Sequence, residues 1–167
     1  MNKYVKGSVL LISFFIAINT AYSQDIEVVV HRTQIDSTLG SEMVFDFEII
    51  NISQAIQTVF EVRTINNLPN NWTSSLCFGV NCFPPSLDSV ATTTDFNTPP
   101  INPGDTLKSS LHVTALQNDG TANVQIQIGT FRNPTNRTIL DFIATTPEAL
   151  EDEITVVVHQ TNIDSTL

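Results

Sequence analysis

The chain has 167 residues and carries 17 acidic against 7 basic side chains, a formal net charge of −10. The acids are spread along the chain rather than gathered in a tail. This charge repels the phosphates of nucleic acids and the surfaces of anionic membranes, so we expect no nucleic-acid partner. We interpret the acids as promoting solubility, with a cation-binding face as the alternative.

Residues 1–23 have the composition of a secretory signal peptide. Lys3 and Lys6 precede an apolar run from Val9 to Ile18, followed by small residues spaced as a cleavage site. The run holds about 10 residues, roughly half of what a bilayer-spanning helix needs. We therefore expect a secreted or extracellular protein, free or attached to the cell surface. No membrane insertion is expected after the signal is removed.

The first half of the mature chain alternates apolar and polar residues with a period of two, as half-buried strands do. A first strand begins at Ile26, a polar connection covers 33–42, and a second strand runs from Met43 to Ile49. After a polar turn at 51–54, a third strand is predicted to bury one set of side chains (Ile56, Phe60, Val62) and expose the other (Gln57, Glu61, Arg63). The short turn predicts that the second and third strands form a hairpin.

The second half continues in the same way. Residues 66–71 have the composition of a turn, 72–78 are extended, and 84–104 form mostly a loop with one short strand at 87–93. Two strongly alternating stretches, 107–115 and 122–128, flank an Asn-Asp-Gly turn at 118–120 and predict a second hairpin. A last strand at 139–143 completes the module, and the acidic stretch 145–153 is expected to be a linker.

The chain then begins to repeat itself. Residues 26–39 read IEVVVHRTQIDSTL and residues 154–167 read ITVVVHQTNIDSTL, identical at 11 of 14 positions with an offset of 128 residues. An offset of this size is typical of tandem domains. We therefore expect a signal peptide at 1–23, a module at 24–144, a linker at 145–153 and the first strand of a second copy at 154–167. Adjacent copies of the module are the expected partners, and the 154–167 strand is expected to lie outside the first module's core.

Seven to nine short strands without helical periodicity predict an all-β fold of two packed antiparallel sheets, an immunoglobulin-like β-sandwich. The core is expected to include the only tryptophan and the large apolar residues of the alternating strands: Trp72, Phe45, Phe47 and Phe60.

The sequence holds few residues with chemical roles. Cys77 and Cys82 are separated by four residues, whereas a redox dithiol usually has two, so we expect a disulfide that closes a small loop. His31 and His112 lie on the polar faces of their strands, and no third ligand accompanies them. Asp36 recurs as Asp164, either as a turn cap or as an interdomain calcium ligand. We expect no catalytic residues, no metal site and no cofactor.

Three segments carry a resemblance to a known family. They are Leu68-Pro-Asn-Asn-Trp-Thr-Ser-Ser-Leu-Cys77, Cys82-Phe-Pro-Pro85 and Pro103-Gly-Asp-Thr106. Together they resemble the immunoglobulin-like modules of large exported proteins of Bacteroidota-type bacteria, over about Met43 to Ile143. Those proteins often carry a C-terminal sorting domain for the type IX secretion system. The resemblance implies structural roles for Trp72 and for the two cysteines.

These observations predict a non-enzymatic immunoglobulin-like repeat that acts as a spacer or adhesion scaffold. The alternative is a carbohydrate-binding or enzyme-accessory module, with an extracellular protein or a glycan as partner. A glycan-binding face needs exposed aromatic rings, and Phe78 and Phe83 at the cysteine loop are the candidates for such a platform.

Overall fold

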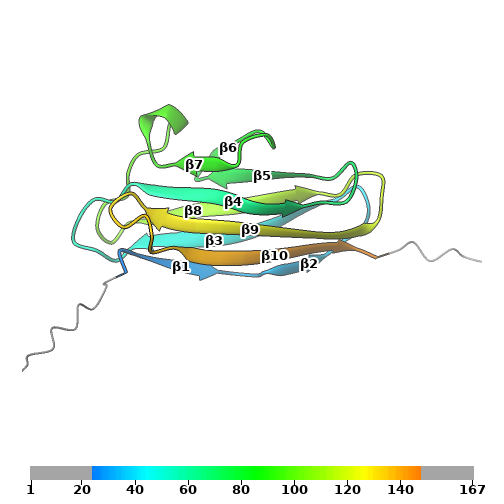
Figure 1. Cartoon of the computed structure of the whole chain (residues 1–167), viewed down its shortest axis with the longest axis horizontal. Helices are drawn as coiled ribbons and strands as arrows, with labels where there is room; N and C mark the ends of the chain where they lie inside the picture. The colour runs from blue at the N-terminus through cyan, green and yellow to red at the C-terminus, as the bar shows by residue number, and fades with distance from the viewer. Residues whose placement is uncertain (1–23, 148–167) are drawn as a thin grey trace, which may run out of the picture.

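The computed structural model describes residues 24–147, and the predicted signal peptide and second copy lie outside them. Two five-stranded sheets pack face to face (Figure 1). Sheet A has the order β1 (Ile26–Val30), β3 (Glu42–Asn51), β8 (Thr106–Thr114), β5 (Thr73–Phe78), β6 (Asn81–Cys82). Sheet B has the order β2 (Gln34–Asp36), β10 (Thr138–Thr146), β9 (Gly120–Thr130), β4 (Val59–Asn67), β7 (Ser89–Ala91). A short 3-10 turn, η1 (Thr94–Phe96), follows β7. The chain thus forms the predicted immunoglobulin-like sandwich, with ten strands in this segment rather than seven to nine.

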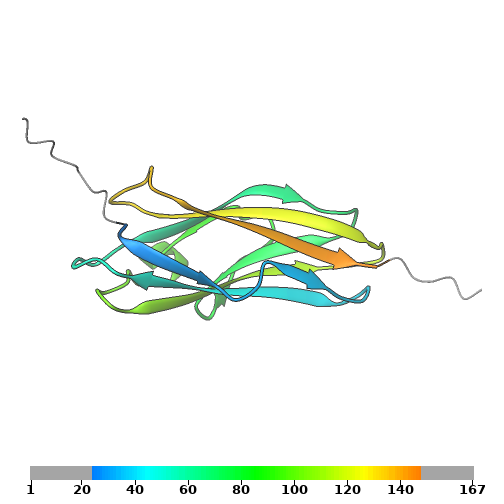
Figure 2. The same cartoon turned by 90° about the horizontal axis from the view of Figure 1, so that it is seen from below.

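The predicted connection at 33–42 contains a strand. The chain leaves β1, which pairs antiparallel with β3 in sheet A, and enters β2, which pairs parallel with β10 in sheet B. The N-terminal segment therefore crosses from one sheet to the other along one edge of the sandwich (Figure 2). Asp36 is the exposed last residue of β2, opposite Thr145. Thr145 and Thr146, placed in the linker by the sequence, belong to β10.

Both predicted hairpins are wrong. β3 and β4 lie in different sheets, and so do β8 and β9. The physical reason is that alternation only requires each strand to turn its apolar face to the core. Two successive strands satisfy this equally well side by side in one sheet or facing each other across the sandwich. The intervening segments, 52–58 and 115–119, are longer than a two-residue hairpin turn and cross between the sheets.

Strand β4 is inverted relative to the prediction. Val59, Glu61 and Arg63 are buried, whereas Ile56, which precedes β4 and was expected inside, is 62% exposed. Glu61 bonds Ser109 of β8 and Arg63 bonds Ser74 of β5, and both partners belong to sheet A. The polar set therefore faces the interior, because sheet A supplies hydrogen-bond partners for it there.

The core between the sheets is built from the remaining strands as expected. Phe45 and Phe47 are fully buried and pack against the ring of Phe142 at 5.0 and 6.0 Å between centroids. Trp72 is 5% exposed and belongs to the same cluster. Phe60 is also buried, but its alternation with Val59 and Glu61 puts it on the outer face of sheet B. Among the residues that the structure describes, no helix is long and apolar enough to cross a membrane.

The two ends of the module lie far apart. In Figures 1 and 2, β1 begins at one end of the long axis and β10 ends at the other. Because the strands run roughly along this axis, the chain enters the module at one pole and leaves it at the opposite pole.

Candidate functional site

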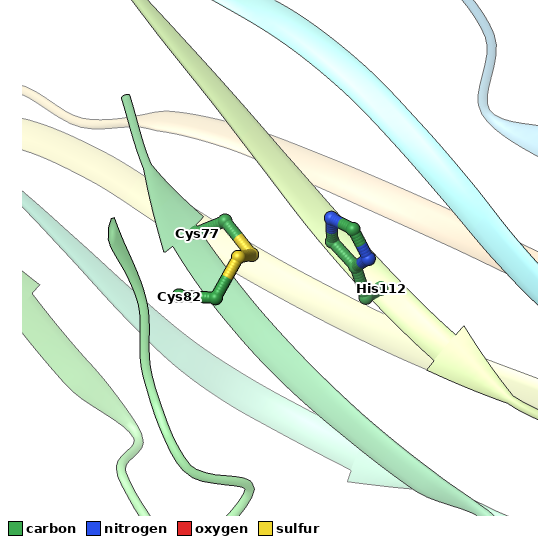
Figure 3. A group of neighbouring side chains, drawn as sticks. All are labelled: Cys77, Cys82 and His112. Carbon is green, nitrogen blue, oxygen red and sulfur yellow. A yellow bond between two sulfur atoms is a disulfide. The ribbon is translucent and has the colours of Figure 1, made fainter. Parts of the chain in front are cut away.

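Three potential ligand groups meet on the outer face of sheet A. Cys77 on β5 and Cys82 on β6 are directly opposite each other and form the predicted disulfide, with Cα atoms 4.0 Å apart. His112 on the neighbouring strand β8 stands beside the sulfur atoms (Figure 3). One ring nitrogen and both sulfurs lie within 4.8 Å of one another. The sequence did not indicate this approach, because it depends on the pairing of β5 with β8.

The hydrogen bonds of His112 define its neutral tautomer. Nδ1 lies 3.0 Å from Oε1 of Glu42, and Nε2 lies 3.0 Å from Oγ of Ser110. A carboxylate oxygen can only accept, so Nδ1 donates to Glu42. In the neutral ring Nε2 then carries the lone pair and accepts from the Ser110 hydroxyl.

This cluster has limited chemistry while the disulfide is present. A metal ion binds cysteine as the thiolate, and here both sulfurs are bonded to each other. One imidazole is the ligand that remains. The disulfide joins β6, the edge strand of sheet A, to β5. Its effect is structural, because it attaches this edge strand and the loop that follows it to the rest of the sheet.

The strongest electrostatic anomaly lies between the sheets. Oγ of Ser109 is 2.6 Å from Oε1 of Glu61 and 2.8 Å from the carbonyl oxygen of Cys77. A serine hydroxyl has one hydrogen and cannot donate to both oxygens. Both bonds form if Glu61 is protonated, because the carboxyl then donates to Ser109 and Ser109 donates to the carbonyl. Burial raises the pKa of Glu61 to about 8, which agrees with a protonated carboxyl at neutral pH.

The second oxygen of this carboxyl lacks a partner. Among side-chain polar atoms of residues 24–147, Oε2 of Glu61 is buried without a hydrogen bond. The cost of burying such a group is lower for the neutral carboxyl than for the carboxylate. We interpret this feature as one that concerns stability, because burial is what raises the pKa of the carboxyl.

Arg63 is the other buried charge on β4. Its side chain is 1% exposed, and Nη2 pairs with Oδ1 of Asp88 at 2.6 Å. Nη1 donates to the hydroxyl and carbonyl oxygens of Ser74 at 2.6 and 2.7 Å, and Nη2 also donates to the Pro85 carbonyl at 2.6 Å. The guanidinium thus fastens the 84–88 loop to β4 and β5. The guanidinium thus has its ion-pair and hydrogen-bond partners within the protein, so we assign Arg63 a structural role.

The structure buries one of the two rings of the predicted ligand platform. Phe78 is fully buried inside the sandwich, because its position on β5 alternates inward with Leu76. Phe83 is half-buried and packs edge-on against Phe96, with 5.4 Å between ring centroids. The predicted pairing of two exposed rings is therefore wrong, because Phe78 is inside the core.

The exposed aromatic ring is on the other side of the molecule. Phe131, just after β9, is 60% exposed and packs edge-on over Phe60 on the outer face of sheet B, 5.6 Å between centroids. The Arg137 guanidinium carbon lies 5.2 Å from the centre of the Phe60 ring. Ile139 and Ile65 are 55% and 40% exposed on the same face. The sequence analysis missed this exposed patch because it assigned Phe60 to the core-facing side of its strand.

A polar row separates the apolar residues of this face. Gln125, in the middle of β9, accepts from the Thr64 hydroxyl and donates to Asp141, both at 2.8 Å. Arg137 donates to Gln127 at 3.0 Å. The face thus combines an exposed ring with amide, carboxylate and guanidinium groups, the side chains that contact proteins or glycans.

A further depression of 570 Å³ lies at the outer face of sheet A, lined in part by Arg32, Lys108, Asp46 and Glu48. Its two basic and two acidic side chains offset each other, so it does not select the charge of a ligand. His31 also lines it and is exposed, as the sequence predicted.

Comparison with known proteins gives information about the fold but not about the function. No protein-family model matches the sequence, and no curated protein is significantly similar to it. The N-terminal domain of PorA is similar in structure, with a TM-score of 0.52 and 14% identity over 72% of this chain and 96% of that one.

Two further solved structures are similar at lower scores. A lipoprotein from Bacteroides thetaiotaomicron has a TM-score of 0.48 and 14% identity, over 83% of this chain and 93% of its own. A family 123 glycoside hydrolase from Clostridium perfringens has a TM-score of 0.49 and 10% identity, over 75% of this chain and 28% of its own. Identities this low are uninformative about function.

Proposed function

We propose that this chain provides a non-enzymatic immunoglobulin-like repeat of an exported protein, acting as a spacer or adhesion scaffold outside the cell. The observation that carries the proposal is the placement of the module's ends. β1 begins at one pole and β10 ends at the opposite pole. The sequence of β1 starts again at Ile154, shortly after β10 ends at Thr146.

This arrangement suits an extended array. Because the chain enters the module at one pole and leaves it at the other, successive copies add along the long axis. β9 has 11 residues, which at about 3.4 Å per residue gives a strand about 37 Å long. Each added copy therefore lengthens the array by about 40 Å. The predicted signal peptide and the disulfide agree with an exported location.

Small-angle X-ray scattering tests this proposal. The test protein joins a second module, residues 26–147, to the end of residues 24–153, and the single module 24–147 is the control. We expect the maximum dimension to rise by about 40 Å in the tandem protein. A rise of less than about 15 Å would mean that copies fold side by side, and the spacer proposal would fail.

A second candidate function is ligand binding by the outer face of sheet B. The exposed ring of Phe131 and the hydrogen-bonding row around Gln125 and Asp141 favour it. We expect Phe131→Ala to reduce retention on an immobilised array of glycans or extracellular proteins while the melting temperature stays within about 2 °C of wild type. The matched control is Leu39→Ala, since Leu39 is exposed outside this face. Equal retention of both variants would rule out ligand binding through Phe131, and the spacer role would be the remaining proposal.

A further inference from the structure

The repeated segment corresponds to one structural unit, the strand pair β1–β2 at the edge of the sandwich. Its core-facing residues are Ile26, which is buried, and Val28, Val30 and Ile35, which pack against the core. The corresponding residues of the second copy are identical: Ile154, Val156, Val158 and Ile163.

The differences between the two segments lie on the outside. Three positions differ, with Glu27, Arg32 and Gln34 replaced in the second copy by Thr155, Gln160 and Asn162. Glu27, Arg32 and Gln34 are all exposed in the structure. The 154–167 segment therefore carries the same apolar side chains that β1 and β2 turn toward the core.

The hydrogen bonds at this position are made mainly by the backbone, and Ser37, whose Oγ accepts from Ser41 Oγ at 2.8 Å, is also serine (Ser165) in the second copy. β1 pairs with β3 through the backbone from Ile26 opposite Asn51 to Val30 opposite Phe47. Beyond β1, Ile143 N donates to Thr33 O and Ser37 N donates to Thr145 O, each at 2.9 Å. β1 and β2 are the edge strands of their sheets, so they can be replaced without breaking any inner pairing.

We propose that residues 154–167 of one molecule occupy the β1–β2 position of a second copy, so that copies associate by strand exchange. This inference rests on the repeat and on the edge geometry, and it holds whether or not the module acts as a spacer. The partner is a second copy of this chain, and the shared surface is formed by the edges of β3 and β10 with which β1 and β2 now pair.

Distance favours a second molecule over the same one. β10 covers eight residue steps, about 27 Å, and its first residue lies beside the start of β1, since Gln24 Nε2 is 3.4 Å from Thr138 Oγ1. Residues 146 to 154 also span eight steps, at most about 26–29 Å when fully extended. The segment reaches its own molecule's β1 position only with this connection stretched to its limit. A second molecule is free of that constraint.

The native β1–β2 keeps the advantage of covalent attachment to β3 through a short connection. Exchange should therefore become dominant when the native strand is weakened. In the protein from residue 24 to residue 167, the variant Ile26→Asp/Val28→Asp places charges on the core-facing side of β1 only. The matched control adds Ile154→Asp/Val156→Asp, which disables the second copy as well.

We expect the first variant to keep the wild-type far-ultraviolet circular dichroism and to double or further multiply its mass by light scattering. The control should be monomeric and largely unfolded. A synthetic peptide of residues 154–167, added in excess to the control, should restore the thermal transition followed by Trp72 fluorescence, whereas a peptide with Val156→Asp should not. A first variant that is monomeric and as unfolded as the control, together with an inactive peptide, would overturn the proposal.

Discussion

Glu61 shows how one residue can link burial to pH. Its folded pKa of about 8 lies above the ordinary value of 4.5. Between these values the folded protein keeps a proton on Glu61 that the unfolded chain releases, so stability falls as pH rises through this window. Below pH 4.5 both states are protonated and the stabilising contribution is fully present.

Glu61→Gln should remove this dependence, because the amide can still donate to Ser109 but does not titrate. We expect its urea midpoint to change less than that of the wild type from about pH 5 to about pH 8, and to be higher than the wild type at the upper end. Glu27→Gln, at an exposed position on β1, serves as the control. Parallel pH profiles for wild type and Glu61→Gln would contradict this role for the buried carboxyl.

Trp72 combines burial with one specific hydrogen bond. Its Nε1 donates to the Asn118 carbonyl at 2.7 Å, which ties the start of β5 to the crossing between β8 and β9. Trp72→Ala should lower the free energy of unfolding by about 3–5 kcal/mol, and Trp72→Phe by less, since the phenyl ring keeps part of the packing. Denaturant titration of both variants measures this. Unchanged stability in Trp72→Ala would mean that the ring is not a structural anchor.

At the scale of single strands, the alternation of apolar and polar residues predicted the buried face correctly only where the polar side chains had no hydrogen-bond partners in the core. β3, β8, β9 and β10 agree with the expected pattern because their outward side chains reach solvent. β4 does not, because Glu61 finds Ser109, Arg63 finds Ser74 and Asp88, and Phe60 finds an apolar site on the outer face. These partners come from segments distant in the chain, so no local pattern could reveal them.

Phe60 and Gly129 form a contact that local sequence also concealed. They are paired across β4 and β9, and a Cβ atom added to Gly129 would lie 2.7 Å from Cζ of the Phe60 ring. Gly129→Ala should therefore destabilise the module by about 1–3 kcal/mol through overpacking. The measurement is the urea midpoint of the variant.

The double variant Gly129→Ala/Phe60→Leu provides the control. Leucine is smaller than phenylalanine, so adding the alanine should cost less in the Phe60→Leu background than in the wild type. Equal costs in both backgrounds would show that Phe60 is not the group that excludes a side chain at Gly129.

At the scale of the whole molecule, the sequence predicted two packed sheets but not which strands belong to each sheet. Each strand's apolar face indicates only that a core exists, and both sheets meet that core from opposite sides. The approach of His112 to Cys77 depends on which strands pair, and the exposed patch around Phe131 depends on which side of β4 faces outward. The repeat, in contrast, can be read directly from the sequence, and its three differences fall at positions that are exposed in the first copy.

The acidic excess is also a property of the whole molecule. The chain has 17 acidic and 7 basic residues, so carboxylates far outnumber cations. Repulsion among exposed carboxylates opposes the compact state, and salt screens it over about 10 Å at 0.1 M ionic strength. The melting temperature at neutral pH should therefore rise by a few degrees as sodium chloride increases from about 0.02 M to about 0.3 M. Differential scanning fluorimetry measures this, and the rise should shrink near pH 4, where many surface carboxylates are protonated. A melting temperature that stays flat or falls with added salt at neutral pH would show that self-repulsion is not a significant term in the stability of this module.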